Sequence, residues 1–300
     1  MKNSSGKLSY VGKKVFVGID VHKRTYSVVT VVEGVIVKKW TTAAIPEKLA
    51  IQLGRYFPGA FIHTAYESGF SGFVLHRVLS KAGINNLVVN PGSIEVAVHN
   101  RVKTDKRDAL KIATLLEVGR LRGIRVPTQQ QEQQRLLTRT RQQLIEDRTA
   151  IKNKIRMKCH QMGLINPDDH REMSHKLVGE LLSRTNSPEL SLVIEAYWQV
   201  WKSIETQIKK IEQQLNEQAK VDPNETIYRS APGIGPLSSR ILSNELGDLS
   251  QFANERQLFS YTGLTPSEHS SGDTIRKGRI TRQGNSRVRY IRVASGLASH

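Results

Sequence analysis

Hydrophobic residues between about positions 14 and 125 alternate between two patterns. Three short segments rich in β-branched residues come first, at 14–20, 25–32 and 34–42. Only a few polar residues separate them, which is typical of a three-strand meander. Helix-like and strand-like segments then take turns: a helix at 46–57 that starts with Pro46, a strand at 61–67, a helix at 71–83 that ends at Gly83, a strand at 86–90, and two basic helical stretches up to Gly123. The order β-β-β-α-β-α-β-α predicts an α/β unit, in which helices pack on a mixed sheet around one core.

Residues 128–220 follow a helical pattern instead. Apolar side chains recur at alternating steps of four and three, as in the seam of a coiled coil, at Leu190, Ile194, Tyr197, Trp201, Ile204, Ile208, Ile211 and Leu215. In an earlier segment Leu137, Leu144 and Ile151 lie seven residues apart, but Arg141 and Arg148 occupy seam positions between them. The two segments, with the sequence INPDD between them, are expected either to fold back as an antiparallel hairpin or to pair between chains. Ordinary helix packing explains the same stripe equally well.

A third region starts at Thr226 and contains a glycine-rich turn. Its PGIG sequence resembles the turn of a helix-hairpin-helix motif. There Gly233 and Gly235 let the backbone approach a phosphate, which the N–H groups at the start of the next helix bind. Glycine also simply makes turns, so the motif alone does not decide between these two interpretations. A further helix is expected at 250–263.

The end of the chain is polar and basic. Between Arg276 and Arg292 there are seven Lys or Arg residues and no acidic one. Ser270 and Ser271 precede this stretch, but a serine is a poor nucleophile until a base or a neighbouring charge activates it. From the residues alone, the stretch is a solvated, DNA-binding loop with incidental serines.

The charge balance narrows the kind of partner. The 300 residues carry a formal net charge of +18, and a soluble chain this basic usually binds a polyanion, because Lys and Arg on phosphates release condensed counterions. Ribosomal proteins and many basic enzymes share this property. Cys159 is the single cysteine, which excludes disulfides within the chain and Cys-based zinc sites. No apolar run is long enough to span a membrane, and the N-terminus lacks the core of a secretion signal. The prediction is a cytoplasmic protein with no membrane partner.

Four carboxylates stand at positions that can converge. Asp20 ends the first predicted strand, Glu67 ends the fourth, and Asp105 and Asp108 open a helix with a spacing that puts both on one face. Carboxylates gathered at one point repel each other unless divalent cations neutralise them. Mg²⁺ prefers oxygen ligands, and two such ions about 3.5–4 Å apart can stabilise the entering and leaving oxygens of phosphodiester chemistry.

Each carboxylate taken singly has a structural explanation. An Asp at a strand end is often a turn residue, and Asp105 and Asp108 follow Thr104, a plausible helix N-cap where acidic residues are favoured anyway. The order of the four within this strand pattern favours the catalytic interpretation. Basic neighbours of the acidic pair support it, because a substrate phosphate needs compensation there: Arg101, Lys103, Lys106, Arg107 and Lys111.

These motifs together resemble one family. GID at Asp20, YESG at Glu67, KTDKRDA around Asp105 and Asp108, PGIG, FSYTGLTP and then SSG occur in that order. The sequence is similar, over nearly its whole length, to the DEDD transposases of bacterial insertion sequences, which are relatives of a site-specific DNA invertase. The resemblance implies a RuvC-like, ribonuclease-H-type catalytic domain at 10–126, an α-helical coiled-coil region for oligomerisation at 127–222, and a mainly α C-terminal transposase domain at 223–300 with the helix-hairpin-helix-like motif.

The resemblance also implies a mechanism and partners. The four carboxylates are expected to hold Mg²⁺, with two ions per site, and Ser271, directly before the glycine, to attack DNA and hold it covalently while strands exchange. The expected partners are donor and target DNA, an element-encoded guide RNA of the bridge type, and further copies of the chain in a dimer or tetramer, in the bacterial cytoplasm at the nucleoid. Nucleic-acid contacts are expected from Lys103, Lys106, Arg107, Gly233, Gly235, Arg276, Lys277, Arg279 and Arg282.

One departure from the family pattern bears on activity. Family members usually continue well past the serine, whereas this sequence stops 29 residues after Ser271, within an apolar helical pattern. The C-terminal domain is therefore expected to be truncated. Two alternatives to the recombinase stay open: a metal-dependent junction-resolving nuclease in which water attacks, and an inactive, nucleic-acid-binding remnant.

Overall fold

The computed structural model describes residues 9–94, 105–268 and 276–297. The chain divides into two compact units, Met1–Val126 and Pro127–His300. The first is an α/β unit and the second is mostly helical. The predicted further division of the second unit at residue 222 stays a prediction.

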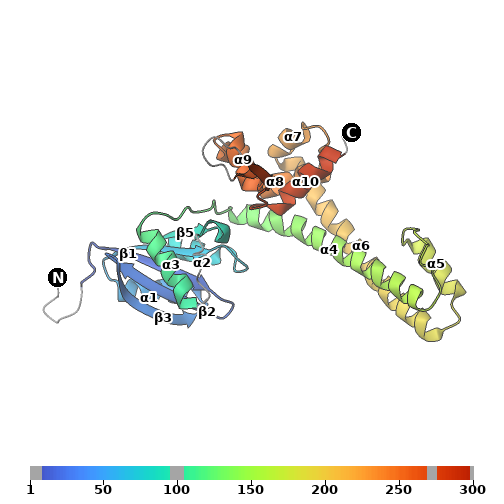
Figure 1. Ribbon diagram of the computed structural model, residues 1–300, viewed down its shortest axis with the longest axis horizontal. Coiled ribbons are helices and arrows are strands. Elements are labelled where there is room, and N and C mark those ends of the chain that lie inside the picture. Colours follow the sequence, from blue (N-terminus) through green and yellow to red (C-terminus); the bar gives the residue numbers. More distant parts are fainter. Residues whose placement is uncertain (1–8, 95–104, 269–275, 298–300) are drawn as a thin grey trace. The chain divides into compact units, whose positions relative to one another are not determined.

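The first unit is built on a five-stranded sheet (Figure 1). Its strands are β1 (Lys14–Val21), β2 (Thr25–Val32), β3 (Val35–Ala43), β4 (Phe61–Glu67) and β5 (Asn85–Val89). They lie in the order β3-β2-β1-β4-β5, with β1 antiparallel to β2 and parallel to β4. The predicted β-β-β-α-β-α-β-α order is confirmed in this unit.

A two-residue turn joins β2 to β3. Glu33 and Gly34, between β2 and β3, have φ values of 52° and 75°. Positive φ at both central residues is the geometry of the tight hairpin turn whose twist matches that of the flanking strands. This is why β3 begins at Val35, one residue later than predicted.

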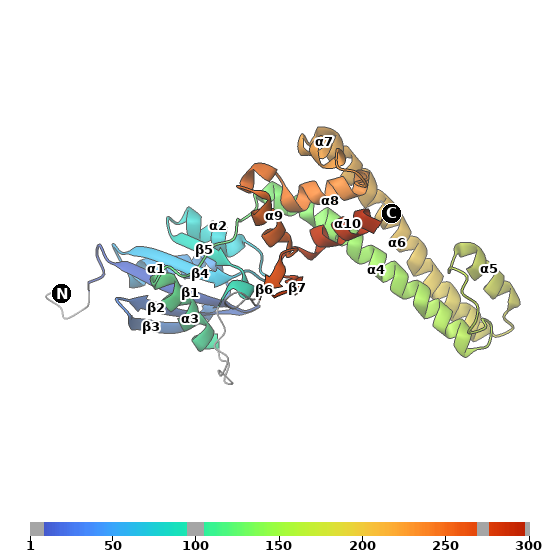
Figure 2. The same ribbon diagram turned by 45° about the horizontal axis from the view of Figure 1, so that its top comes forward.

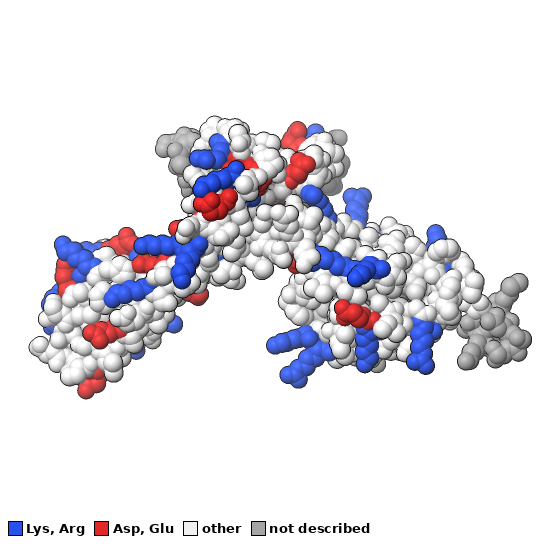
Figure 3. Space-filling model, turned by 180° about the vertical axis from the view of Figure 1, so that it is seen from behind, with Lys and Arg blue, Asp and Glu red and all other residues white. Residues whose placement is uncertain are grey.

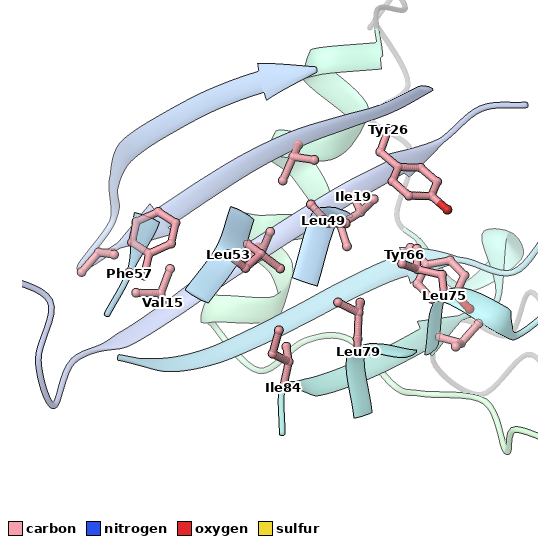
Figure 4. Packing of buried hydrophobic residues seen from close by; sticks show 14 residues of the cluster. Val15, Ile19, Tyr26, Leu49, Leu53, Phe57, Tyr66, Leu75, Leu79 and Ile84 are labelled. Carbon is pink, nitrogen blue, oxygen red and sulfur yellow. The ribbon is translucent and has the colours of Figure 1, made fainter. Parts of the chain in front are cut away.

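Helices cover both faces of this sheet. They are α1 (Pro46–Tyr56), α2 (Val74–Lys81) and α3 (Asp105–Glu117). Figure 4 shows leucines of α1 and α2 packed on Val15 and Ile19 of β1 in the main core. On the opposite face α3 forms a second core with Ala65 of β4 and Val89 of β5. Because side chains alternate along a strand, β1 and β4 contribute to both layers.

The second helix of the first unit is shorter than predicted. The helix expected at 71–83 starts only at Val74. One of the two basic helical stretches predicted before Gly123 is the helix α3. Residues 95–104, between the short helix η1 (Pro91–Ser93) and α3, lie outside the described residues.

Two long helices form the body of the second unit. They are α4 (Gln129–Gln161) and α6 (Pro188–Val221), and they lie side by side in Figures 1 and 2. The buried residues of α6 follow the predicted seam: Leu190, Ile194, Trp201, Ile208 and Leu215. The chain therefore folds back on itself here, while pairing with a second chain stays a prediction. The prediction of a simple connection between the two helices was incomplete. A further helix, α5 (His175–Arg184), lies between them in sequence and shares their core.

The arginines at the seam positions of α4 are paired with glutamates of α6. Arg141 lies 2.5 Å from Glu212, and Arg148 lies 3.9 Å from Glu205. A charge at a seam costs free energy unless it is paired. The glutamates on α6 therefore explain how α4 joins the pair despite its weaker apolar stripe.

The described elements after α6 are α7 (Asn224–Arg229), α8 (Pro236–Leu246), η2 (Leu249–Gln251), α9 (Glu255–Thr262), β6 (Pro266–Glu268), β7 (Lys277–Ile280) and α10 (Ser286–Leu297). The helix predicted at 250–263 starts later, because the Asn254 side chain caps it by accepting a hydrogen bond from the Gln257 N–H. The polar stretch predicted as a loop contains one short strand, β7, which pairs with β6 just before the stretch. In the described part of the chain, no helix is both long and apolar enough to cross a membrane.

A buried ion pair joins α8 to α4. The Glu245 carboxylate is fully buried and accepts two hydrogen bonds of 2.8 Å from the Arg139 guanidinium. The side chain of Asn285 donates a third, also of 2.8 Å. Burial raises the pKa of Glu245, but the hydrogen bonds and charge of Arg139 outweigh it and hold the pKa below its ordinary value.

Candidate metal centre

The register of β1 and β4 brings two of the predicted carboxylates to the same edge of the sheet. Ile19 of β1 pairs in parallel with Tyr66 of β4, and both side chains point into the main core. Asp20 and Glu67 are the next residues of their strands, so both face the opposite side, where α3 packs. The sequence alone suggested this convergence, and the parallel pairing explains it.

A glycine lets α3 approach that face. A Cβ atom on Gly18 would lie 1.9 Å from the Ala109 carbonyl oxygen and 2.6 Å from the Ala113 nitrogen. Only glycine, which lacks this atom, allows the backbone of α3 to lie directly on β1. The contact places the first turn of α3, with Asp105, beside Asp20.

His22 lies between two of the carboxylates. Its Nε2 atom is 3.0 Å from Oδ2 of Asp20 and 3.1 Å from Oδ2 of Asp105. One ligand atom from each of these three side chains lies within 4.8 Å of the others, a group able to hold a metal ion. His22 was not among the site residues predicted from the sequence. Its signal was its position two residues after Asp20, which places both side chains on one side of an extended chain.

The other two predicted carboxylates stand outside this group of three. Glu67 is exposed at the end of β4. Asp108 is half-buried one turn along α3, and its charge still acts on Asp20.

Negative charge is concentrated at this point. Burial raises the pKa of Asp20, and the charges of Asp105 and Asp108 raise it further, while His22 acts in the opposite direction. The net effect is a pKa above the ordinary value for aspartate. A group of acids that disfavours its own ionised form in this way is relieved by a cation.

The residues predicted to contact nucleic acid are exposed where the structure describes them. Arg107 lies on α3, Lys277 and Arg279 lie on β7, and Arg276 and Arg282 flank that strand; all five are exposed. Gly233 has a φ of +77°, and Gly235 caps the start of α8. Lys103 and Ser271 lie outside the described residues, as does the side chain of Lys106. Figure 3 shows Lys and Arg side chains standing out on both units.

Comparisons with known proteins identify the family. A family model described as "Transposase", of the DEDD type, matches residues 17–162, and one described as "Transposase IS116/IS110/IS902 family" matches residues 225–298. The chain belongs to this family of insertion-sequence transposases, enzymes that cleave and rejoin DNA.

Individual relatives agree with this assignment. Protein y4qE of Sinorhizobium fredii is 28% identical over 94% of this chain and 70% of its own length. The transposase for insertion sequence element IS1111A of Coxiella burnetii is 27% identical over 74% of this chain and 62% of its own. This chain thus spans roughly two thirds of these relatives. Among solved structures, Thermus thermophilus RuvC with a Holliday junction substrate is similar at a TM-score of 0.30 and 11% identity, over 37% of this chain and 99% of that one.

Proposed function

We propose that this chain is a transposase that cleaves and rejoins DNA with a divalent cation, Mg²⁺, held at the edge of the β1–β4 pair. The observation that carries the proposal is the close approach of Asp20 and Asp105, which come from distant parts of the sequence. The Gly18 contact that brings them together excludes any larger residue. A costly backbone arrangement that concentrates repelling charges at a surface is typical of a functional site.

The donor set fits a divalent cation. Nε2 of His22 is shielded from solvent, and carboxylate oxygens of Asp20 and Asp105 lie 3.0 and 3.1 Å from it. Adjacent ligands of an octahedral ion at 2.0–2.1 Å lie about 3.0 Å apart, so these atoms already have the spacing of a coordination shell. Asp20 and Asp105 would hold the ion, with Glu67 and Asp108 completing the site or holding a second ion. The bound ion supplies charge to polarise a phosphodiester and to stabilise its leaving oxygen.

Ser271 is the proposed nucleophile, and this assignment follows from the family resemblance. Its hydroxyl loses a proton as its oxygen forms a bond to a DNA phosphorus. The bond from that phosphorus to one sugar oxygen breaks, and the sugar leaves as a hydroxyl. Attack by a different strand's hydroxyl on the serine phosphodiester reverses the step and rejoins DNA. Arg276 and Arg279, both exposed near Ser271 in sequence, can compensate the phosphate charge.

The proposed assembly also follows from the resemblance. Donor and target DNA would be selected by an element-encoded guide RNA, and the chain would work as a dimer or tetramer through its long helices. The net charge of +18 supports contact with nucleic acid. The glycine turn before α8 is a candidate phosphate contact within this assembly.

The test uses the full chain, its element-encoded RNA and a labelled DNA that carries the ends of the insertion sequence. We expect an SDS-resistant protein–DNA adduct that requires Mg²⁺, is lost in Asp20→Asn and Ser271→Ala, and persists in the matched control Ser270→Ala. DNA binding should survive in all three variants.

The alternatives give different products. Free DNA ends without an adduct, formed equally well by Ser271→Ala, identify a junction-resolving nuclease in which water attacks. DNA binding with neither adduct nor cleavage identifies an inactive remnant. An adduct that persists in Ser271→Ala refutes the nucleophile assignment.

A further inference from the structure

We propose that His22 is a ligand of the catalytic cation, which makes the site a mixed nitrogen–oxygen centre with a preference for Mn²⁺ over Mg²⁺. The inference rests on the proposed metal-dependent function and goes beyond the four carboxylates. It is carried by the position of one atom: Nε2 of His22 is buried and lies between Oδ2 of Asp20 and Oδ2 of Asp105.

The local backbone holds this nitrogen in place. The N–H of His22 donates a 2.9 Å hydrogen bond to the Thr25 carbonyl oxygen, which closes the turn from β1 into β2. The side chain itself is 41% exposed, yet its Nε2 atom is shielded. The ring is therefore open to solvent at its edge, while the nitrogen that could bind metal faces the carboxylates.

An ordinary ion pair is the competing explanation, and the two roles predict opposite effects. A histidine that merely neutralises Asp20 and Asp105 competes with a cation, so its removal should strengthen metal binding. A histidine that ligates the cation supplies one of its bonds, so its removal should weaken binding. The arrangement favours the ligand role, because one shielded nitrogen lies at the spacing of neighbouring ligands around one ion from both carboxylate oxygens, and all three atoms lie within 4.8 Å of one another.

An imidazole ligand also changes the selectivity of the site. Carboxylates and water suit Mg²⁺ and Mn²⁺ alike, whereas nitrogen donors favour the transition metal. His22 should therefore raise the affinity for Mn²⁺ more than the affinity for Mg²⁺. The ratio of the two dissociation constants should move toward that of an all-oxygen site when His22 is removed.

The experiment measures binding without turnover. Mn²⁺ is titrated into the full chain without DNA and followed by electron paramagnetic resonance, with Mg²⁺ added in competition. We expect His22→Ala to weaken Mn²⁺ binding about 10–100-fold, the range seen when groups that support a metal are removed, and to weaken Mg²⁺ binding less. His170→Ala, which removes an exposed imidazole from the second unit, is the matched control and should bind as the wild type does.

A second measurement detects the nitrogen ligand directly in the wild-type chain. Pulsed resonance on the Mn²⁺-loaded wild-type chain should show coupling to a directly bound imidazole ¹⁴N, and Asp20→Asn should lose the bound ion. The ligand role is refuted if Mn²⁺ binding requires Asp20 but shows no nitrogen coupling and is unchanged or tighter in His22→Ala. That result leaves the metal site itself standing. Wild-type chain that binds no Mn²⁺, or binds it independently of Asp20, overturns the proposed metal site itself.

Discussion

Replacing Gly18 with alanine tests how the site is assembled. The added Cβ atom would lie 1.9 Å from the Ala109 carbonyl oxygen, whereas real Cβ atoms essentially never come within 3.0 Å of such an atom. Helix α3 must therefore move away from β1 by at least about 1.1 Å. Overpacking of this kind costs about 1–3 kcal/mol, and the movement carries Asp105 away from Asp20 and His22.

Two measurements on one variant follow from this displacement. Gly18→Ala should lower the free energy of unfolding of the first unit by about 1–3 kcal/mol in a denaturant titration. It should also weaken Mn²⁺ binding at least tenfold and reduce DNA cleavage, because a misplacement of about 1 Å near the reacting groups can cost about 100-fold in rate.

The matched control is Gly54→Ala. Gly54 is exposed within α1, and nothing lies within 4 Å of the position of an added Cβ. Alanine should stabilise the helix there by about 0.5–1 kcal/mol and leave metal binding unchanged. If the two variants behave alike in both measurements, the close approach of α3 to β1 does not require glycine and our account of the site's assembly is wrong.

Two further predictions concern the second unit. Glu245→Ala should lower its free energy of unfolding by about 1–3 kcal/mol, because the half-exposed Arg139 guanidinium and the Asn285 amide both lose the buried carboxylate that accepts their hydrogen bonds. Glu217→Ala, which breaks the exposed pair with Lys220, should change it by less than about 1 kcal/mol. Equal losses in denaturant titrations of both variants would count against the buried pair. The folded-state pKa of Glu245 lies below its ordinary value. The stability that ionised Glu245 contributes is therefore complete above about pH 4.3 and is lost as the pH falls through the folded-state pKa. In an acid titration, the free energy of unfolding should decline less steeply in Glu245→Gln than in the wild type.

The order of strands and helices along the first unit could be predicted from the sequence because local rules decide it. The β-branched segments of the meander are separated by only a few residues, so short turns must connect them. The later apolar segments are separated by helical patterns. The positions of Asp20 and Glu67 at strand ends could be read in the same way. Their convergence could be suggested, but the parallel register of β1 with β4 that produces it could not be read, because it is a long-range pairing.

Other features depended on contacts that a single sequence does not record. Gly18 follows a strand-like pattern and carries no sign that a helix from residue 105 onward will pack on it. His22 resembles an ordinary loop histidine until α3 brings Asp105 beside it. The helix α5 was missed because its short apolar stripe is completed only by the core it shares with α4 and α6.

The candidate metal centre and the Gly18 contact form one physical system. The carboxylates of α3 lie beside Asp20 only while the helix backbone rests on β1. Burial and the charges of Asp105 and Asp108 raise the pKa of Asp20, so this arrangement disfavours its ionised form. A cation removes that opposition, so its binding should also hold α3 against the sheet. His22 shares this role, because it follows β1 directly and contacts carboxylates of both elements. Displacement of α3 should therefore weaken metal binding and lower the stability of the first unit together. Loss of His22 alone should weaken metal binding and leave the sheet intact.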